Sequence, residues 1–252
     1  MHATTSSWNR RFGLLALPAL LAVGCNGPLL PDPAVRYIAF GDSSTAGPAS
    51  INYWQYLQQD LDQPPAAFVS QGKGGETTAE GLPRLQDLLD REIYPNAQVL
   101  LFWEGGGDIL GFIRDHDPLL ATSPNDSDYP FADDLAAALD QTQANIEQAI
   151  DRAQQAGLQV YVATYYYLAP GQCRPALLNV LLPEQANRAN EYVRLLNERI
   201  RHAADNAGAR LVEVGAQAEI LAADLANYFD CNHLSEKGNR AVANLFLQAI
   251  RP

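Results

Sequence analysis

The chain predicts an α/β fold in which a parallel sheet carries helices on both faces. Short apolar runs of strand length alternate along the sequence with longer segments of helical, amphipathic periodicity. Two helix-ending glycines, Gly157 and Gly208, are each followed by a strand-like run. Such alternation builds right-handed βαβ units, because parallel neighbours are joined by crossover connections. In sheets of this kind, ligands bind beyond the carboxyl ends of the strands.

The predicted elements follow one another from residue 35. Strands are expected at 35–40, 67–69, 99–103, 159–164 and 211–214. Helices are expected between them at 52–61, 79–91, 132–156 and 184–207. A last helix, 235–250, begins with a capping serine and continues with apolar residues on one face. The polar stretch 111–131 contains three prolines and is predicted to be a long connection near the site, of a kind that can act as a lid.

The first 24 residues have the composition of a cleaved export signal. Arg10 and Arg11 precede an apolar run, 12–23, which is too short to span a bilayer as a helix. The segment 21–25, Leu-Ala-Val-Gly-Cys, resembles a bacterial lipobox, in which Cys25 becomes the lipidated first residue. The alternative is an ordinary secretory signal. Residues 1–24 are predicted to be a signal peptide, 25–34 a lipidated cysteine with its tether, and 35–252 one domain.

The charge of the chain argues against anionic partners. The formal net charge is −12, and residues 1–24 contain two arginines and no acids. Their removal takes the 17 basic side chains to 15 against 29 acidic ones, a charge of −14. Such a surface repels phosphate backbones and anionic headgroups, so no nucleic-acid partner is expected. Membrane association would come from the lipid on Cys25 alone, at the outer membrane or periplasm, unless the protein is secreted.

The cysteines that remain after export predict a disulfide rather than a metal site. Cys173 and Cys231 can pair in an oxidising compartment, the alternative being two free thiols. Neither has a histidine or cysteine at zinc-ligand spacing. The acids of 111–131 do not match a calcium loop and are expected on a solvated surface. No metal and no other cofactor is predicted.

Candidate catalytic residues lie near the two ends of the domain. Ser43 follows the first predicted strand in the triplet G-D-S, and Asp230 and His233 form a D-x-x-H pair just before the last helix. A serine becomes a nucleophile when a base takes its proton, and the base needs a third group to orient it. No G-x-S-x-G elbow is present. The remaining histidines lie in less suitable segments: His2, His116 and His202.

Four segments, in order along the chain, resemble the sequence blocks of the SGNH/GDSL hydrolase family. They are 40–43, 70–78, 103–108 and 230–233. The resemblance implies a three-layer αβα sandwich with a flavodoxin-like, parallel five-stranded sheet, the SGNH hydrolase fold. It implies that Ser43 is the nucleophile, His233 the base and Asp230 the residue that orients His233. It also implies an oxyanion hole made by the backbone N–H groups of Ser43 and Gly75 and by an asparagine side chain.

The chain departs from the family pattern at the position of that asparagine, which is Gly107. Glycine offers only its backbone N–H, and loss of one oxyanion donor can lower a rate by about 10²–10³-fold. Asn232 or the backbone of 106–107 could compensate. Otherwise the enzyme would be slow or would have lost catalysis.

The substrate is expected to be a small-molecule or glycan ester. Asp42, Tyr165 and Tyr166 are candidate substrate-binding residues, although the tyrosines could instead pack under a loop. The predicted function is a serine esterase acting on carboxylic, short-chain or acetyl esters. The alternatives are an envelope lipoprotein, catalytically weakened or inactive, that binds a glycan or peptide, and an acyltransferase that uses the same three residues.

Overall fold

A five-stranded, all-parallel sheet forms the centre of the domain. The computed structural model describes residues 30–173 and 180–251, so the expected signal peptide and Cys25 lie outside the described residues. The strand order is β2-β1-β3-β4-β7. The strands are β1 (Tyr37–Gly41), β2 (Phe68–Gly72), β3 (Val99–Trp103), β4 (Gln159–Ala163) and β7 (Arg210–Val212). This is the flavodoxin-like order, and it confirms the predicted fold class.

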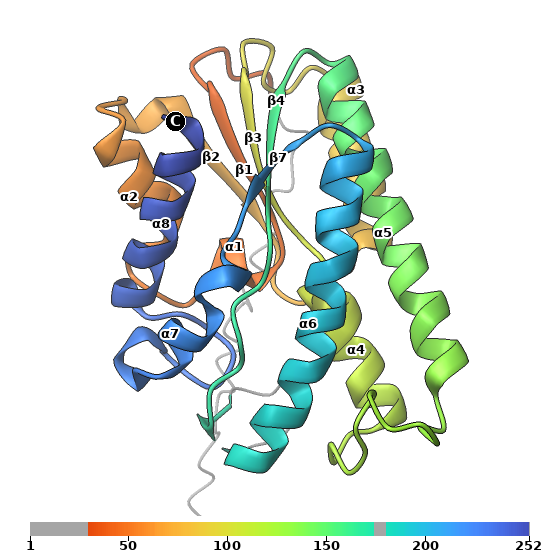
Figure 1. Ribbon diagram of the computed structural model, residues 1–252. Coiled ribbons are helices and arrows are strands. Elements are labelled where there is room, and N and C mark those ends of the chain that lie inside the picture. The colour runs from red at the N-terminus through yellow and green to blue at the C-terminus, as the bar shows by residue number, and fades with distance from the viewer. Residues whose placement is uncertain (1–29, 174–179, 252) are drawn as a thin grey trace, which may run out of the picture. The chain divides into compact units, whose positions relative to one another are not determined.

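Helices cover both faces of this sheet, as Figure 1 shows. On one face lie α2 (Tyr53–Asp60) and α8 (Glu236–Ile250). On the other lie α3 (Thr78–Asp90), α5 (Ala132–Gln155) and α6 (Pro183–Asn206). Within the described part of the chain, no helix has both the length and the apolarity that crossing a bilayer requires.

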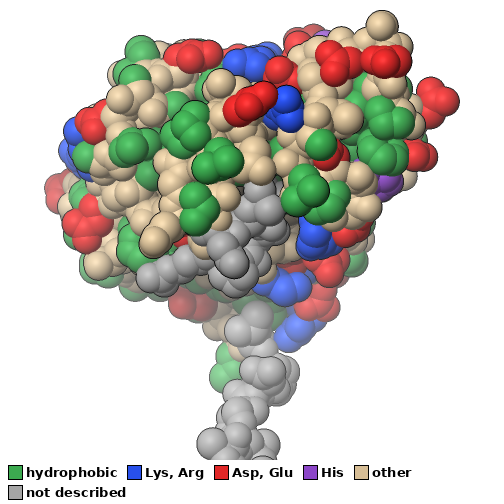
Figure 2. Space-filling model, turned by 90° about the horizontal axis from the view of Figure 1, so that it is seen from below, with side chains coloured by type: hydrophobic (Ala, Val, Ile, Leu, Met, Phe, Trp, Pro, Cys, Tyr) green, Lys and Arg blue, Asp and Glu red, His purple; other side chains and the backbone are tan. Residues whose placement is uncertain are grey.

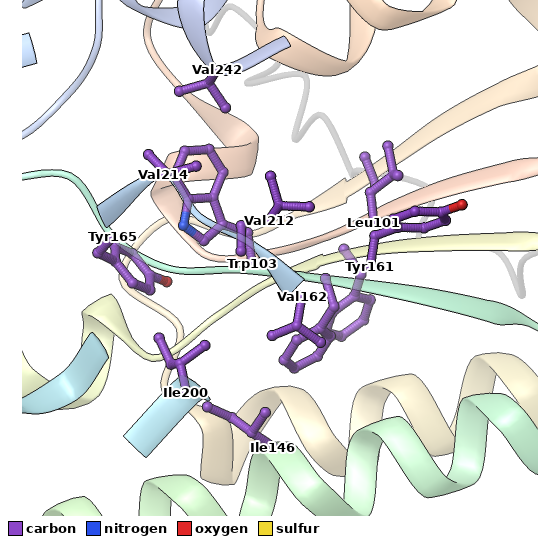
Figure 3. Packing of buried hydrophobic residues seen from close by; sticks show 14 of the residues in the cluster. Leu101, Trp103, Ile146, Tyr161, Val162, Tyr165, Ile200, Val212, Val214 and Val242 are labelled. Atoms are coloured by element: carbon purple, nitrogen blue, oxygen red, sulfur yellow. The ribbon is translucent and has the colours of Figure 1, made fainter. Parts of the chain in front are cut away.

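The central strands are apolar along their whole length because both of their faces are covered. All five residues of β3 are buried. The largest of these side chains, Trp103, is fully buried and lies beside Tyr165, as Figure 3 shows. Burial of each large apolar side chain contributes about 1.5–3 kcal/mol. The end of β3 is therefore well packed and supports the loops that follow the strands.

The end of β1 approaches β3 too closely for a side chain. A β-carbon on Gly41 would lie 1.9 Å from the carbonyl oxygen of Trp103, and the φ angle of Gly41 is +152°, which also favours glycine. The next residue, Asp42, donates its backbone N–H to the same carbonyl at 3.2 Å. The chain can therefore turn sharply after β1 and present Ser43 at the carboxyl end of the sheet.

The prediction of an irregular connection at 111–131 was wrong for its first six residues. Helix α4 runs from Gly106 to His116. Ile109, Phe112 and Ile113 face the core at helical spacing, but the three glycines 105–107 conceal where the helix starts. The remainder turns back at Asp117, whose carboxylate accepts the backbone N–H groups of residues 121 and 122.

Several short elements were not predicted. They are α1 (Ser43–Ala46), α7 (Ala218–Ala222), the antiparallel pair β5 (Gly171–Gln172) and β6 (Val180–Leu181), and three 3₁₀ turns at Pro65–Ala67, Gly215–Gln217 and Leu225–Asn227. Elements this short carry too few residues to show a period in sequence.

Candidate active site

Three of the segments singled out in the sequence meet at the carboxyl end of the sheet. Ser43 begins α1 directly after β1, and Gly107 lies in the first turn of α4 after β3. In Figure 1 both helices lie below the strands. The D-x-x-H segment precedes α8, the start of which lies at the same end. The site therefore falls where β1 and β3 adjoin, the point at which the strand order reverses.

The turn that presents Ser43 is held by the residue before it. One carboxylate oxygen of Asp42 accepts the backbone N–H of Ser44 at 2.8 Å, which caps the short helix α1. The other oxygen accepts the hydroxyl of Tyr165 at 2.6 Å. Asp42 is 2% exposed, and desolvation by burial raises the pKa of its carboxyl. Asp42 thus supports the turn from inside, while Ser43 itself is half-buried.

Asp230 and His233 form a direct contact. Nδ1 of His233 lies 2.9 Å from Oδ2 and 3.0 Å from Oδ1 of Asp230. The same carboxylate accepts the backbone N–H groups of Asn232 at 2.9 Å and His233 at 2.8 Å. Three local interactions therefore set the orientation of the imidazole. The contact leaves Nε2 as the ring nitrogen that can exchange a proton with another group.

The loop that carries this pair is clamped to the segment after β4. Cys173 and Cys231 are joined by a disulfide bond. Backbone hydrogen bonds flank it, from Cys231 N to Gln172 O at 2.8 Å and from Ala169 N to Cys231 O at 2.9 Å. Cys231, which lies between Asp230 and Asn232, is thus covalently attached to the residue that follows β5.

A small pocket lies beside Ser43. Its free volume is only about 20 Å³, and both Ser43 and Asn232, the neighbour of His233, line it. Its apolar wall comes mainly from α4 and α6: Ile109, Leu110, Val193 and Leu196. No hydrogen bond joins Ser43 to His233 in the described residues, an arrangement that is common before substrate binds. The pocket therefore places an apolar wall next to the serine and leaves little free space there.

The surface around this end mixes apolar and acidic side chains, as Figure 2 shows. Exposed apolar side chains occur in the segments next to the site: Leu119 after α4, Leu182 before α6 and Phe229 before Asp230. No cluster of three or more metal-ligating side chains occurs in 30–173 and 180–251.

Two of the predicted oxyanion residues, Gly75 and Gly107, lie in segments that touch each other, the loop before α3 and the first turn of α4. Gly75 is exposed in the loop between β2 and α3. A β-carbon on Gly107 would lie 2.0 Å from the backbone carbonyl oxygen of Glu76. The carbonyl of Glu76 thus occupies the space that a side chain at 107 would need. The packing of the loop against α4 therefore excludes an asparagine side chain at position 107.

A buried pair of acids beneath this loop was missed from the sequence. Glu76 and Glu104 are 1% and 2% exposed. Desolvation by burial, followed by the neighbouring Glu76, raises the pKa of Glu104 to about 10, so its carboxyl is protonated at neutral pH. Desolvation by burial raises the pKa of Glu76, but hydrogen bonds from Arg84, together with the other groups around this carboxyl, outweigh it. The pKa of Glu76 is therefore lowered, and its carboxyl stays ionised. The available signal was an acidic residue at the end of the fully apolar strand β3.

The predicted substrate-binding tyrosines line the pocket, but their hydroxyl groups bind the protein. The hydroxyl of Tyr165 donates to Asp42, and that of Tyr166 donates to the backbone carbonyl of Asn232 at 2.8 Å. Both tyrosines are buried. Contact of Asp42, Tyr165 or Tyr166 with a substrate stays a prediction.

Comparisons with known proteins agree with this fold. Residues 39–241 match the GDSL-like Lipase/Acylhydrolase family. Among solved structures, the chain is similar to an acetyl xylan esterase, with 21% identity, a TM-score of 0.56 and coverage of 86% of this chain and 100% of that one. It is similar to a psychrotrophic esterase from Pseudoalteromonas sp., with 16% identity, a TM-score of 0.55 and coverage of 86% and 96%. It is also similar to a lipase from a goat rumen metagenome, with 16% identity, a TM-score of 0.61 and coverage of 85% and 97%.

At these identities the solved structures show the fold alone, and no curated protein matches the chain. The family match shows more than the fold, because it covers most of the chain, from within β1 to within α8. It therefore includes all four sequence blocks, and it confirms the resemblance found in the sequence. The chain belongs to the GDSL-like lipase/acylhydrolase family and is, as a member of it, a hydrolase of ester bonds.

Proposed function

We propose that the protein hydrolyses short-chain or acetyl carboxylic esters through Ser43, His233 and Asp230. His233 Nε2 takes the proton of Ser43 Oγ as the oxygen attacks the ester carbonyl. The proton then passes to the leaving alcohol as the tetrahedral intermediate collapses to an acyl-enzyme. Water, activated by the same imidazole, releases the acid and restores Ser43. Asp230 holds the imidazole and stabilises its cationic form.

The observation that carries this proposal is the contact between Asp230 and His233. A carboxylate at 2.9 Å from Nδ1, itself fixed by two backbone N–H groups, is the arrangement that a general base requires. Ser43 and Asn232 line the same pocket, which supports a role for the adjacent His233 at that serine.

The oxyanion would be stabilised by backbone groups. The N–H groups of Ser43 and Gly75 are the proposed donors, whereas the backbone N–H of Gly107 hydrogen-bonds the carboxylate of Asp42. Because the Glu76 carbonyl fills the space over Gly107, no side-chain donor can come from that position. We expect turnover of unactivated esters to be slower, by about 10²–10³-fold, than with a full set of donors.

The pocket favours a small acyl group on a neutral or glycan ester. Its limited volume and apolar wall suit an acetyl or short-chain acyl group. The similarity to an acetyl xylan esterase supports the same substrate class. No cofactor enters this mechanism.

A fluorophosphonate probe tests the nucleophile. We expect stoichiometric labelling of the wild-type protein, with mass spectrometry locating the adduct on Ser43. The variant Ser43→Ala should neither label nor hydrolyse p-nitrophenyl acetate. A folded wild-type protein that fails to label would contradict the proposal.

A second variant tests the carboxylate. Asp230→Asn should lower kcat by about 10³–10⁴-fold, because the amide no longer fixes the imidazole tautomer. Asp224→Asn is the matched control, since Asp224 also lies before α8 but pairs with the exposed Lys237. Equal activity of both variants would remove Asp230 from the mechanism.

Gly107 favours one other function, that of a catalytically weakened or non-catalytic protein that binds a glycan or peptide. Intact esters together with measurable binding would support it. Acyl transfer uses the same three residues, and an added sugar or alcohol acceptor would reveal it as a transesterified product.

We also propose that the protein is exported and anchored by a lipid on Cys25. Residues 10–25 support this through their charge, apolar run and lipobox-like ending. Metabolic labelling with a radioactive fatty acid should mark the wild type and leave Cys25→Ser unmarked. Equal labelling of both would exclude Cys25 as the site.

A further inference from the structure

Two consecutive tyrosines after β4, Tyr165 and Tyr166, are held by ring packing, and Tyr165 is also held at its backbone. The side-chain amide of Asn197 on α6 accepts the N–H of Tyr165 at 2.6 Å and donates to its carbonyl at 2.8 Å. The rings of Tyr165 and Tyr166 both pack on Trp103, each with a centroid distance of 5.8 Å. Figure 3 shows the first of these pairs. The two hydroxyl groups are therefore carried on one rigid unit.

The hydroxyl of Tyr165 contacts the turn formed by residues 42–44, called here the serine turn. It donates to Asp42 at 2.6 Å, and Asp42 caps the helix that begins with Ser43. A β-carbon on Gly106 would lie 2.7 Å from both the Asp42 carboxylate and the Tyr165 ring. Tyr165 and Asp42 are thus packed directly on the first turn of α4, and they hold it against the turn after β1.

The hydroxyl of Tyr166 contacts the loop formed by residues 228–234, called here the histidine loop. It donates to the backbone carbonyl of Asn232 at 2.8 Å, one residue before His233. The side chain of Ser44, next to the nucleophile, also hydrogen-bonds the Tyr166 hydroxyl. The ring of Tyr228, from the same loop as His233, packs edge-on against Tyr166 at 6.1 Å.

We propose that Tyr165 and Tyr166 are positioning residues that set the separation of Ser43 and His233: the Tyr165 hydroxyl holds the serine turn, and the Tyr166 hydroxyl joins the histidine loop to Ser44. The proposal rests on the proposed function. Ser43 and His233 are 190 residues apart and belong to different loops. The disulfide fixes the histidine loop to Cys173, the residue after β5, whereas the tyrosine pair bonds both the serine turn and the histidine loop.

The consequence for catalysis follows from the geometry of proton transfer. The serine and imidazole must approach to about 3 Å in the transition state, and a misplacement of about 1 Å can cost 10²-fold in rate. Removal of one hydroxyl leaves ring packing intact but frees one half of the site. We therefore expect kcat to fall by about 10–100-fold while KM changes less than about 2-fold.

The experiment compares Tyr165→Phe, Tyr166→Phe and the double variant with the wild type. Tyr129→Phe is the matched control, because its buried hydroxyl bonds that of Tyr192 at 2.9 Å and neither of these residues lines the pocket. Each protein is assayed with p-nitrophenyl acetate at a temperature at which circular dichroism shows it folded. The rate of fluorophosphonate labelling is measured in parallel.

Both single variants should lose kcat and label slowly, and the control should match the wild type. The double variant should lose little more than the worse single variant, because either loss already separates the two halves. Equal kcat for the tyrosine variants and the control overturns the inference, as does a fall confined to KM. A wild-type protein that neither labels nor hydrolyses contradicts the proposed function instead.

Discussion

The backbone carbonyl of Glu76 lies directly over Gly107, 2.0 Å from where a β-carbon would be. The loop that carries Gly75 thereby rests on the first turn of α4. The buried side chain of Glu76 is held by Arg84, with Nε to Oε1 at 2.8 Å, and by Lys73 at 3.3 Å. The loop cannot retreat from Gly107 without breaking these contacts.

The first prediction is that asparagine at 107 will not restore the family oxyanion donor. Gly107→Asn should lower the free energy of unfolding by about 1–3 kcal/mol through overpacking, and it should reduce activity. Gly111→Asn makes the same substitution on the same helix, where the nearest contact of a β-carbon is the end of Arg114 at 3.6 Å. Thermal unfolding should separate the two variants. A stable, more active Gly107→Asn protein would show that the loop moves freely.

The second prediction concerns Glu104, whose pKa burial raises from 4.5 to about 10. In the unfolded chain the Glu104 carboxyl loses its proton near pH 4.5. In the folded protein the carboxyl keeps its proton up to about pH 10. The unfolded state therefore binds fewer protons between these values, and the free energy of unfolding falls as pH rises through them, by at most about 1.4 kcal/mol per pH unit. The lowered pKa of Glu76 acts only on the acid side of this window.

Glu104→Gln removes this titration while keeping the size of the side chain. Its Tm should exceed that of the wild type by several degrees at pH 9 and by little at pH 5. The control is Glu198→Gln, at an exposed position on α6. Parallel Tm curves for the wild type and Glu104→Gln from pH 5 to 9 would show that Glu104 does not keep its proton.

The third prediction concerns the disulfide between Cys173 and Cys231, which joins residues 58 apart. Its loss should lower the free energy of unfolding by about 2–4 kcal/mol and Tm by about 5–15 °C. Activity should fall as well, because Cys231 adjoins Asp230. Reductant should bring the wild type to the Tm of Cys173→Ser/Cys231→Ser and leave that variant unchanged. A wild-type Tm insensitive to reductant would show that the bond does not contribute.

The fourth prediction concerns acyl-chain length. Leu110 lines the pocket beside Ser43, so Leu110→Ala should enlarge it. At about 0.8 kcal/mol per buried CH₂, kcat/KM for butyrate relative to acetate should rise by about 10-fold. Leu89→Ala is the matched control, because Leu89 lines a cavity at the opposite end of the sheet. An unchanged butyrate-to-acetate ratio would place the acyl group elsewhere.

Much of the architecture could be predicted because its signals are local and repeated. The central strands and long helices carry the periodicity of their burial, so β3 and α5 were found within one residue at each end. Helix α4 was missed because 105–107 are glycines, which carry no periodic signal at the point where the helix begins.

The sequence by itself determined the order of strands and helices, the family, and which serine, histidine and aspartate to consider. Each of these follows from residue types and from their spacing along the chain. Only the tertiary structure decided that the Glu76 carbonyl excludes a side chain at 107, that Glu104 is buried beside Glu76, and that two tyrosine hydroxyls connect the serine turn to the histidine loop. These relationships join segments 28 to 190 residues apart, and their energies depend on contact distance and desolvation, which exist only once the chain has packed.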